Sequence, residues 1–213
     1  EKKGVLSGVL IVQRIVTVFA IVMAFFPIAN PANICGMISN KISLFTSAVS
    51  LTSLTEDLGR AFRMGWVDTS IFIILYIGAV FAGLGLIATG AGACMSLGNL
   101  KLQRLGQKFS LGGAIAEIVG YVICFVSYIM LANGGIVDAK VEKINPTMPV
   151  GVFVFGAFAL IILILSIFAM LKMPKVPADM KFEMESKYKL FLMFLPFAFL
   201  CFLFCYLPLY GWR

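Results

Sequence analysis

The stretch SIFIILYIGAVFAGLGLIATGAGACM, Ser70–Met95, runs for twenty-six residues without a charged side chain. Because an α-helix rises about 1.5 Å per residue, a helix of this length exceeds the roughly 30 Å of hydrocarbon in a lipid bilayer. Backbone N–H and C=O groups find no water in that hydrocarbon, and a helix pairs them within one segment. The stretch therefore predicts a helix that crosses a membrane.

Four other stretches of the chain are nearly as long and as apolar. Together with the first, they predict transmembrane helices at about residues 5–28, 67–95, 110–132, 149–171 and 189–210. The composition agrees, since 61% of the residues are hydrophobic and 13% are charged, whereas a soluble domain carries about 25% charged residues. We expect an all-α, polytopic integral membrane protein whose surroundings are the lipid bilayer.

The expected helices fall into two groups. Residues 1–172 are expected to form a four-helix transmembrane bundle, and residues 189–213 a fifth transmembrane helix. Between them lies the charged linker 173–188, whose two prolines end the fourth span. Near residues 40–64, apolar side chains recur at three- and four-residue spacing, which predicts either an amphipathic helix on the outer membrane surface or an ordinary packed extracellular helix.

Basic residues are distributed unevenly between the two sides of the membrane. One side receives ten of them: Lys2, Lys3, Lys101, Arg104, Lys108, Lys172, Lys175, Lys181, Lys187 and Lys189. The other side receives five: Lys41, Arg60, Arg63, Lys140 and Lys143. The positive-inside rule then predicts a cytoplasmic N-terminus in the cell membrane. It also accounts for the net charge of +7, so we expect no nucleic-acid partner.

Small residues follow one another along the second predicted span. Gly78, Ala82, Gly85 and Thr89 recur at alternating four- and three-residue spacing, which predicts a face where another helix packs closely. The overlapping motif GLGLIA, Gly83–Ala88, also fits the G-x-G-x-x-A pattern of dinucleotide-binding proteins. That motif requires a preceding strand, whereas this one lies in the middle of an apolar helix, so we favour helix packing.

Two ionisable residues fall inside predicted spans. Arg14 and Glu117 have opposite charges and lie at similar predicted depths of roughly 10–14 Å from the cytoplasmic ends of their spans. Because an unpaired charge in a membrane is costly, we expect an ion pair that fixes the register of the helices. A proton or ion site is the functional alternative, and the Arg14 side chain can also extend to the cytoplasmic surface.

Several sequence features that are common in enzymes are absent. The sequence contains no histidine, and no CxxC, HExxH or P-loop motif. Five cysteines form no recognisable disulfide framework. We therefore expect no enzymatic activity, no catalytic residue and no cofactor or metal site.

The C-terminal stretch KYKLFLMFLPFAFLCFLFCYLPLYGWR, residues 187–213, has a second distinctive pattern. A basic start leads into LFLMFLP, Leu190–Pro196, and the apolar run ends in YLPLYG, Tyr206–Gly211. This order resembles the first core helix of ABC-transporter permeases for oligosaccharides and polysaccharides. The resemblance covers 27 of the 213 residues.

The resemblance implies the membrane-spanning part of a saccharide importer, with the preceding bundle as an accessory or stabilising module. It also implies a second permease subunit, an ATPase subunit and an extracellular solute-binding protein as partners. The family's further core helices and ATPase-docking loop are not in this sequence, so no substrate residue is carried over and we expect a piece of a longer permease. The alternatives are a free-standing tetraspan scaffold and a small ion-coupled carrier that uses Arg14 and Glu117.

Overall fold

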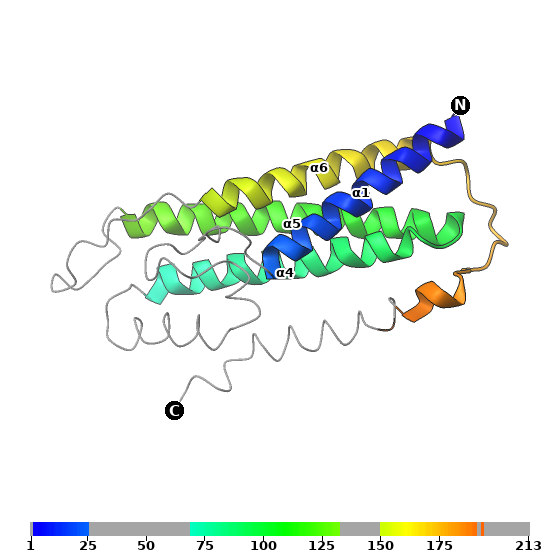
Figure 1. The fold of residues 1–213 in the computed structure, drawn as a ribbon. Helices are drawn as coiled ribbons and strands as arrows, with labels where there is room; N and C mark the ends of the chain where they lie inside the picture. Colours follow the sequence, from blue (N-terminus) through cyan, green and yellow to red (C-terminus); the bar gives the residue numbers. More distant parts are fainter. Residues whose placement is uncertain (1, 26–68, 133–149, 191–192, 194–213) are drawn as a thin grey trace.

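The computed structural model describes residues 2–25, 69–132, 150–190 and 193. In these residues it contains helices and no strand, which confirms the all-α class. The four long helices are α1 (Lys2–Phe25), α4 (Thr69–Met95), α5 (Leu100–Ala132) and α6 (Val150–Lys172) (Figure 1). The predicted amphipathic helix near 40–64, the connection 133–148 and nearly all of the predicted fifth span lie outside the described residues.

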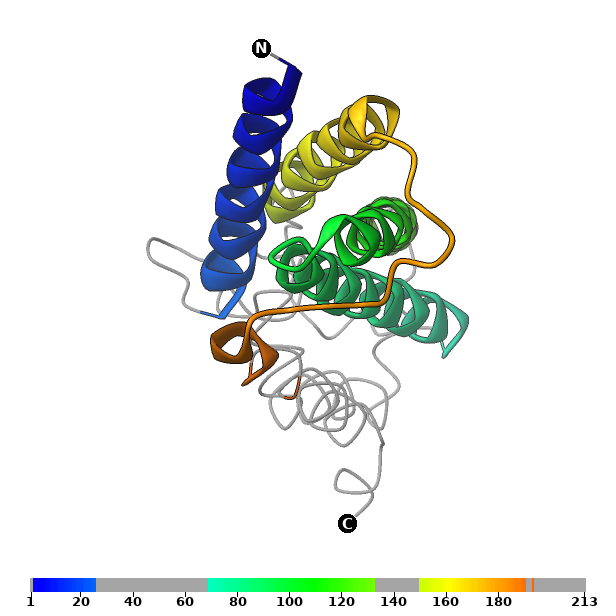
Figure 2. The ribbon, with the colours of Figure 1, turned by 90° about the vertical axis from the view of Figure 1, so that its right-hand side faces the viewer.

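The four helices pack side by side, and each makes its main contacts with two others. α4 and α5 form an antiparallel pair joined by residues 96–99, α6 lies along α5, and α1 lies against α6 and α4. Figure 1 shows the start of α1, the α4–α5 turn and the end of α6 at the same end of the helices, and Figure 2, seen from that end, shows the linker running from α6 past the α4–α5 turn. Tyr121 of α5 stacks on Phe155 of α6, with ring centroids 6.2 Å apart.

Three helices of the described structure are long and apolar enough to cross a membrane. The qualifying segments are Gly4–Ile21, Leu100–Ser127 and Val154–Lys172, and Val80–Met95 is a shorter apolar helix. Their outward faces carry large apolar side chains at high exposure, such as Ile15 at 57%, Val122 at 55% and Ile164 at 62%. A water-soluble protein rarely exposes so much contiguous apolar surface. The chain is a membrane protein.

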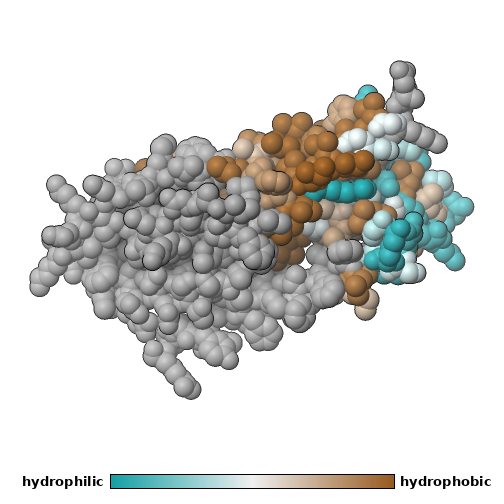
Figure 3. Space-filling model, viewed as in Figure 1, coloured by the Kyte–Doolittle hydropathy of each residue, from teal (hydrophilic) through white to brown (hydrophobic). Residues whose placement is uncertain are grey.

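Hydrophilic residues gather at one end of these helices, where α4 turns into α5, and apolar residues cover the helix surfaces beside it (Figure 3). The described basic residues of segments 101–108 and 172–189 lie in this region, which we call the basic end. The sequence predicted a common side for these residues, and in the structure they share one end of the helices.

The start of α5 differs from the prediction by ten residues. Residues 96–109 were expected to form a connection, but α5 already begins at Leu100. Asn99 is the N-cap: its side-chain Oδ1 accepts the Leu102 N–H at 3.1 Å, and its carbonyl accepts the Gln103 N–H at 2.8 Å. The basic residues that suggested a loop therefore lie on the first turns of a helix, where long cationic side chains can reach an aqueous surface.

Candidate functional site

Several polar side chains lie buried among the apolar ones in the interior of the packed helices, and the outward faces are apolar. The buried polar residues are Gln13, Thr17, Thr89, Ser96, Gln107, Ser110, Glu117, Ser127 and Ser166. In hydrocarbon a polar group finds no partner outside the protein, so it is directed toward neighbouring helices.

The side chain of Gln13 joins three helices. Its Oε1 accepts a hydrogen bond from Gln107 Nε2 of α5 at 2.9 Å, and its Nε2 donates to Ser166 Oγ of α6 at 2.7 Å. The Ser166 hydroxyl in turn donates to the Ile162 carbonyl at 2.7 Å. One amide thus uses both its donor and its acceptor between helices, which fixes the rotation of α1 relative to α5 and α6.

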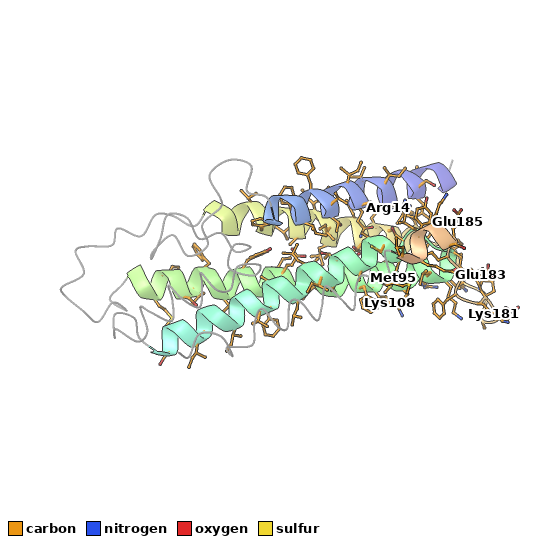
Figure 4. All side chains as sticks on the ribbon, turned by 60° about the horizontal axis from the view of Figure 1, so that its bottom comes forward. Arg14, Met95, Lys108, Lys181, Glu183 and Glu185 are labelled. Carbon is orange, nitrogen blue, oxygen red and sulfur yellow. The ribbon has the colours of Figure 1, made fainter. Side chains whose placement is uncertain are left out.

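Arg14 fastens α1 to the end of α4. Its Nε donates to Ser96 Oγ at 2.7 Å, and its Nη2 donates to the Ser96 carbonyl at 2.6 Å. The Ser96 hydroxyl lies 2.6 Å from the Ala93 carbonyl, to which it donates. The guanidinium therefore satisfies groups at the C-terminal end of α4, where a helix end favours positive charge. Figure 4 shows Arg14 at the basic end.

Glu117 lies fully buried between α4 and α5. Its Oε1 is 3.0 Å from the Thr89 hydroxyl, which is also 3.0 Å from the Leu86 carbonyl. Its Oε2 has no hydrogen-bond partner among the described residues. Among the acidic side chains that the structure describes, this one is fully buried, whereas Asp179, Glu183 and Glu185 are exposed.

The predicted ion pair between Arg14 and Glu117 is wrong. The two side chains bind different partners, Ser96 and Thr89, which are seven residues or about 10 Å apart along α4. The physical reason is the early start of α5: Glu117 lies seventeen residues into its helix and not seven, so its true depth does not match that of Arg14. The contacts of Arg14 agree with the alternative prediction, in which its side chain extends toward the basic end.

The small residues Gly78, Ala82, Gly85 and Thr89 lie where α4 meets α5, as their spacing predicted. A Cβ added to Gly85 would lie 2.6 Å from the Gly113 carbonyl oxygen and 2.6 Å from Glu117 Cγ. A Cβ on Gly120 would lie 2.6 Å from the Gly78 carbonyl and 2.5 Å from the Ala82 nitrogen. The two backbones approach so closely that there is no room for a methyl group between them.

A second row of glycines, on α5, was not recognised from the sequence. Glycines of the two helices meet in pairs, and in each pair the close approach involves a backbone carbonyl: Gly92 with Gly106, Gly85 with Gly113, and Gly78 with Gly120. Both rows repeat every seven residues, which keeps two antiparallel helices in contact over successive turns. We call these six residues the glycine ladder. The seven-residue spacing of Gly106, Gly113 and Gly120 is a signal that the sequence already contains.

The linker after α6 is bound to the α4–α5 turn. The Asn99 N–H donates to the Glu183 carbonyl at 2.9 Å, and Asn99 Nδ2 donates to the Lys181 carbonyl at 2.7 Å. Lys101 Nζ donates to the Met180 carbonyl at 2.7 Å and lies 4.8 Å from the centre of the Phe182 ring. The charged side chains remain exposed as expected, but the backbone of residues 180–183 is held in place (Figure 4).

Beyond the bound segment, Lys187 Nζ lies 2.7 Å from Glu185 Oε2, and both side chains are exposed. The hydrogen bond to this carboxylate raises the pKa of Lys187. A short helical segment, residues 186–190, follows and contains this lysine.

No known protein family, no curated protein and no solved structure matches this chain. Within the described residues no group of three or more Cys, Asp or Glu side chains is placed to hold a metal ion.

Proposed function

We propose that this chain is the membrane-spanning part of an ABC importer permease that takes up a saccharide. In this proposal the packed helices α1, α4, α5 and α6 form an accessory module, and residues 189–213 are the first helix of the permease core. The support for the transport class is the resemblance of residues 187–213 to that helix. The support for the modular arrangement comes from the linker.

The bound linker is the observation that carries the modular arrangement. Three hydrogen bonds from Asn99 and Lys101 hold the linker at residues 180–183, and Asn99 also caps α5. The chain that follows therefore begins at a defined position beside the α4–α5 turn. An unattached linker would leave the position of the next helix undefined, whereas this attachment lets the accessory module position that helix.

The proposed orientation places the basic end in the cytoplasm. Segments 101–108 and 172–189 hold eight Lys or Arg residues against three Asp or Glu residues. Short basic segments remain on the cytoplasmic side during insertion. The start of the proposed core helix then lies on the side where an ATPase subunit binds in such importers, and a solute-binding protein would act on the opposite side.

Expression of the chain from its native gene, together with the neighbouring genes, tests the proposal. An affinity tag before α1 should recover an ATPase subunit and a second permease subunit, and ATP hydrolysis by the complex should rise with a saccharide and its binding protein. Recovery of the chain alone, with no ATPase activity, would favour the free-standing tetraspan scaffold and refute the importer.

A matched pair of variants tests the role of the linker attachment. Asn99→Ala removes the side-chain bond to the linker and the helix cap, whereas Lys175→Ala changes an exposed linker residue. We expect the first variant to reduce saccharide-stimulated ATP hydrolysis and the second to leave it unchanged. Equal activity in both would show that the attachment does not position the core.

A further inference from the structure

Glu117 lies within the close contact between α4 and α5. It is seventeen residues from the first residue of α5 and fifteen from the last, so it sits near the middle of the helix. Gly85 and Gly113 bring the two backbones together beside it, and Glu117 Cγ packs directly against Gly85. The Glu117 side chain is therefore fully buried, and it contacts α4 directly at Gly85.

No positively charged side chain of the surrounding helices reaches this carboxyl in the described structure. On α1, Arg14 is bound to Ser96, and α4 has no Lys or Arg at all. On α6, Lys172 is exposed at the helix end. On α5 itself the nearest cation is Lys108, nine residues or about 13 Å away along the axis. An ionised carboxylate without a cation is strongly disfavoured in such a place.

The other ionisable side chains near this contact are a tyrosine and a cysteine, whose protonated forms are uncharged. Tyr121 lies one turn beyond Glu117 on α5 and stacks on Phe155, and Cys94 lies at the end of α4, five residues beyond Thr89. Neither a phenol nor a thiol supplies a positive charge. The carboxyl group has to be stabilised by losing its own charge.

The two short contacts of the Thr89 hydroxyl are compatible with a neutral carboxyl at Glu117. A hydroxyl carries one hydrogen, yet Thr89 Oγ1 lies 3.0 Å from two acceptors, the Leu86 carbonyl and Glu117 Oε1. If Thr89 donates to Leu86, the contact with Glu117 needs a hydrogen on Oε1. A protonated Oε1 that donates to Thr89 Oγ1 satisfies all three groups, and it leaves Oε2 as a neutral carbonyl oxygen, which is less costly to bury without a partner than a carboxylate oxygen.

We infer that Glu117 is a proton-binding site: a neutral carboxylic acid that donates to Thr89 inside the α4–α5 contact and exchanges its proton when that contact opens. The ligand of this site is the proton itself. The glycine ladder is the part of the structure in which the separation of α4 and α5 changes when the proton is bound or released. Release of the proton would place a negative charge between closely packed backbones, so the charged form favours a wider separation of the two helices. This site is independent of the saccharide importer proposal.

Two measurements on the chain in proteoliposomes at neutral pH test the inference. Dicyclohexylcarbodiimide modifies protonated carboxyls in apolar surroundings, and mass spectrometry identifies the modified peptide. We expect an adduct on Glu117 that is lost in Glu117→Gln. In the infrared spectrum, the C=O band of a neutral carboxylic acid should also be lost in Glu117→Gln and kept in Glu183→Gln, which changes an exposed carboxylate.

Thr89→Val provides a readout that does not depend on the folding of the Glu117 variant. It keeps the shape of the side chain and removes the hydroxyl, so the acid band of Glu117 should shift to higher frequency as its hydrogen bond is lost. Absence of an acid band in the unmodified chain, or loss of a carboxylate band in Glu117→Gln, would overturn the inference. Protection from the carbodiimide by sodium or lithium at constant pH would overturn it as well, because the ligand would then be a metal cation.

Discussion

Two adjacent glycines of α5 should respond to the same substitution with opposite signs. Gly113 is part of the glycine ladder, and an added Cβ would lie 2.6 Å from the Gly85 carbonyl oxygen, 2.7 Å from the Thr89 nitrogen and 2.9 Å from Ala88 Cβ. Gly112 is exposed, and an added Cβ would have no atom within 4 Å. A comparison of the two alanine variants therefore distinguishes the effect of interhelical packing on stability from the effect of helix propensity.

The expected magnitudes follow from these distances. Ordinary van der Waals contact begins near 3.4 Å, so the methyl of Gly113→Ala falls about 0.8 Å short, and two of the three atoms that it meets belong to the α4 backbone. Overpacking of this kind costs about 1–3 kcal/mol, while replacing helical glycine by alanine returns about 0.5–1 kcal/mol. Gly113→Ala should lower the free energy of unfolding by about 1–2 kcal/mol, and Gly112→Ala should raise it by about 0.5–1 kcal/mol.

Reversible unfolding of the two variants in mixed detergent micelles, followed by circular dichroism, measures this difference. A further check is a disulfide between cysteines placed at adjacent positions of α4 and α5, which should form more slowly in Gly113→Ala than in Gly112→Ala. If the two alanine variants are equally stable and cross-link at the same rate, the close approach of α4 and α5 is not present in the membrane and the reasoning is refuted.

Three further predictions concern other contacts. Gln13→Leu should lower the free energy of unfolding by about 1–3 kcal/mol because two interhelical hydrogen bonds are lost, whereas Val12→Leu on the exposed face should have little effect; equal values would contradict this role. Asn99→Ala should speed amide hydrogen exchange of residues 180–185, and unchanged exchange would show that the linker is held in another way. Lys108→Cys, at an exposed position of the basic end, should react with a membrane-impermeant maleimide only from the cytoplasmic side.

The sequence was sufficient to predict the four long helices of the described residues because hydrophobic length is a local property. In lipid, a run of more than twenty apolar residues has few stable backbone conformations other than a helix. The predicted span 67–95 accordingly ends at Met95 in the structure. The start of α5 was missed because Lys101, Arg104 and Lys108 were interpreted as a loop. A helix can continue through such residues when its end lies at the membrane surface, and the N-cap Asn99 was the available signal.

The polar contacts could not be predicted in the same way because they join residues far apart in the chain. Gln13 binds residues 94 and 153 positions away, and no local spacing specifies which face of which helix it meets. Opposite charge and similar depth suggested Glu117 as the partner of Arg14, but depth was counted from an incorrect helix start. Polar backbone and hydroxyl groups at a helix end satisfied the guanidinium instead.

The glycine ladder and the buried Glu117 depend on each other. With larger residues in place of Gly85 and Gly113, α4 and α5 would separate, and the gap beside Glu117 would admit lipid or water that could solvate a charge. In the part of the chain that the structure describes, the carboxyl has one hydrogen-bond partner, the Thr89 hydroxyl. The same packing that stabilises the pair thus excludes the ionised form, and it predicts that Gly113→Ala, which widens this contact, weakens carbodiimide labelling of Glu117 whereas Gly112→Ala does not.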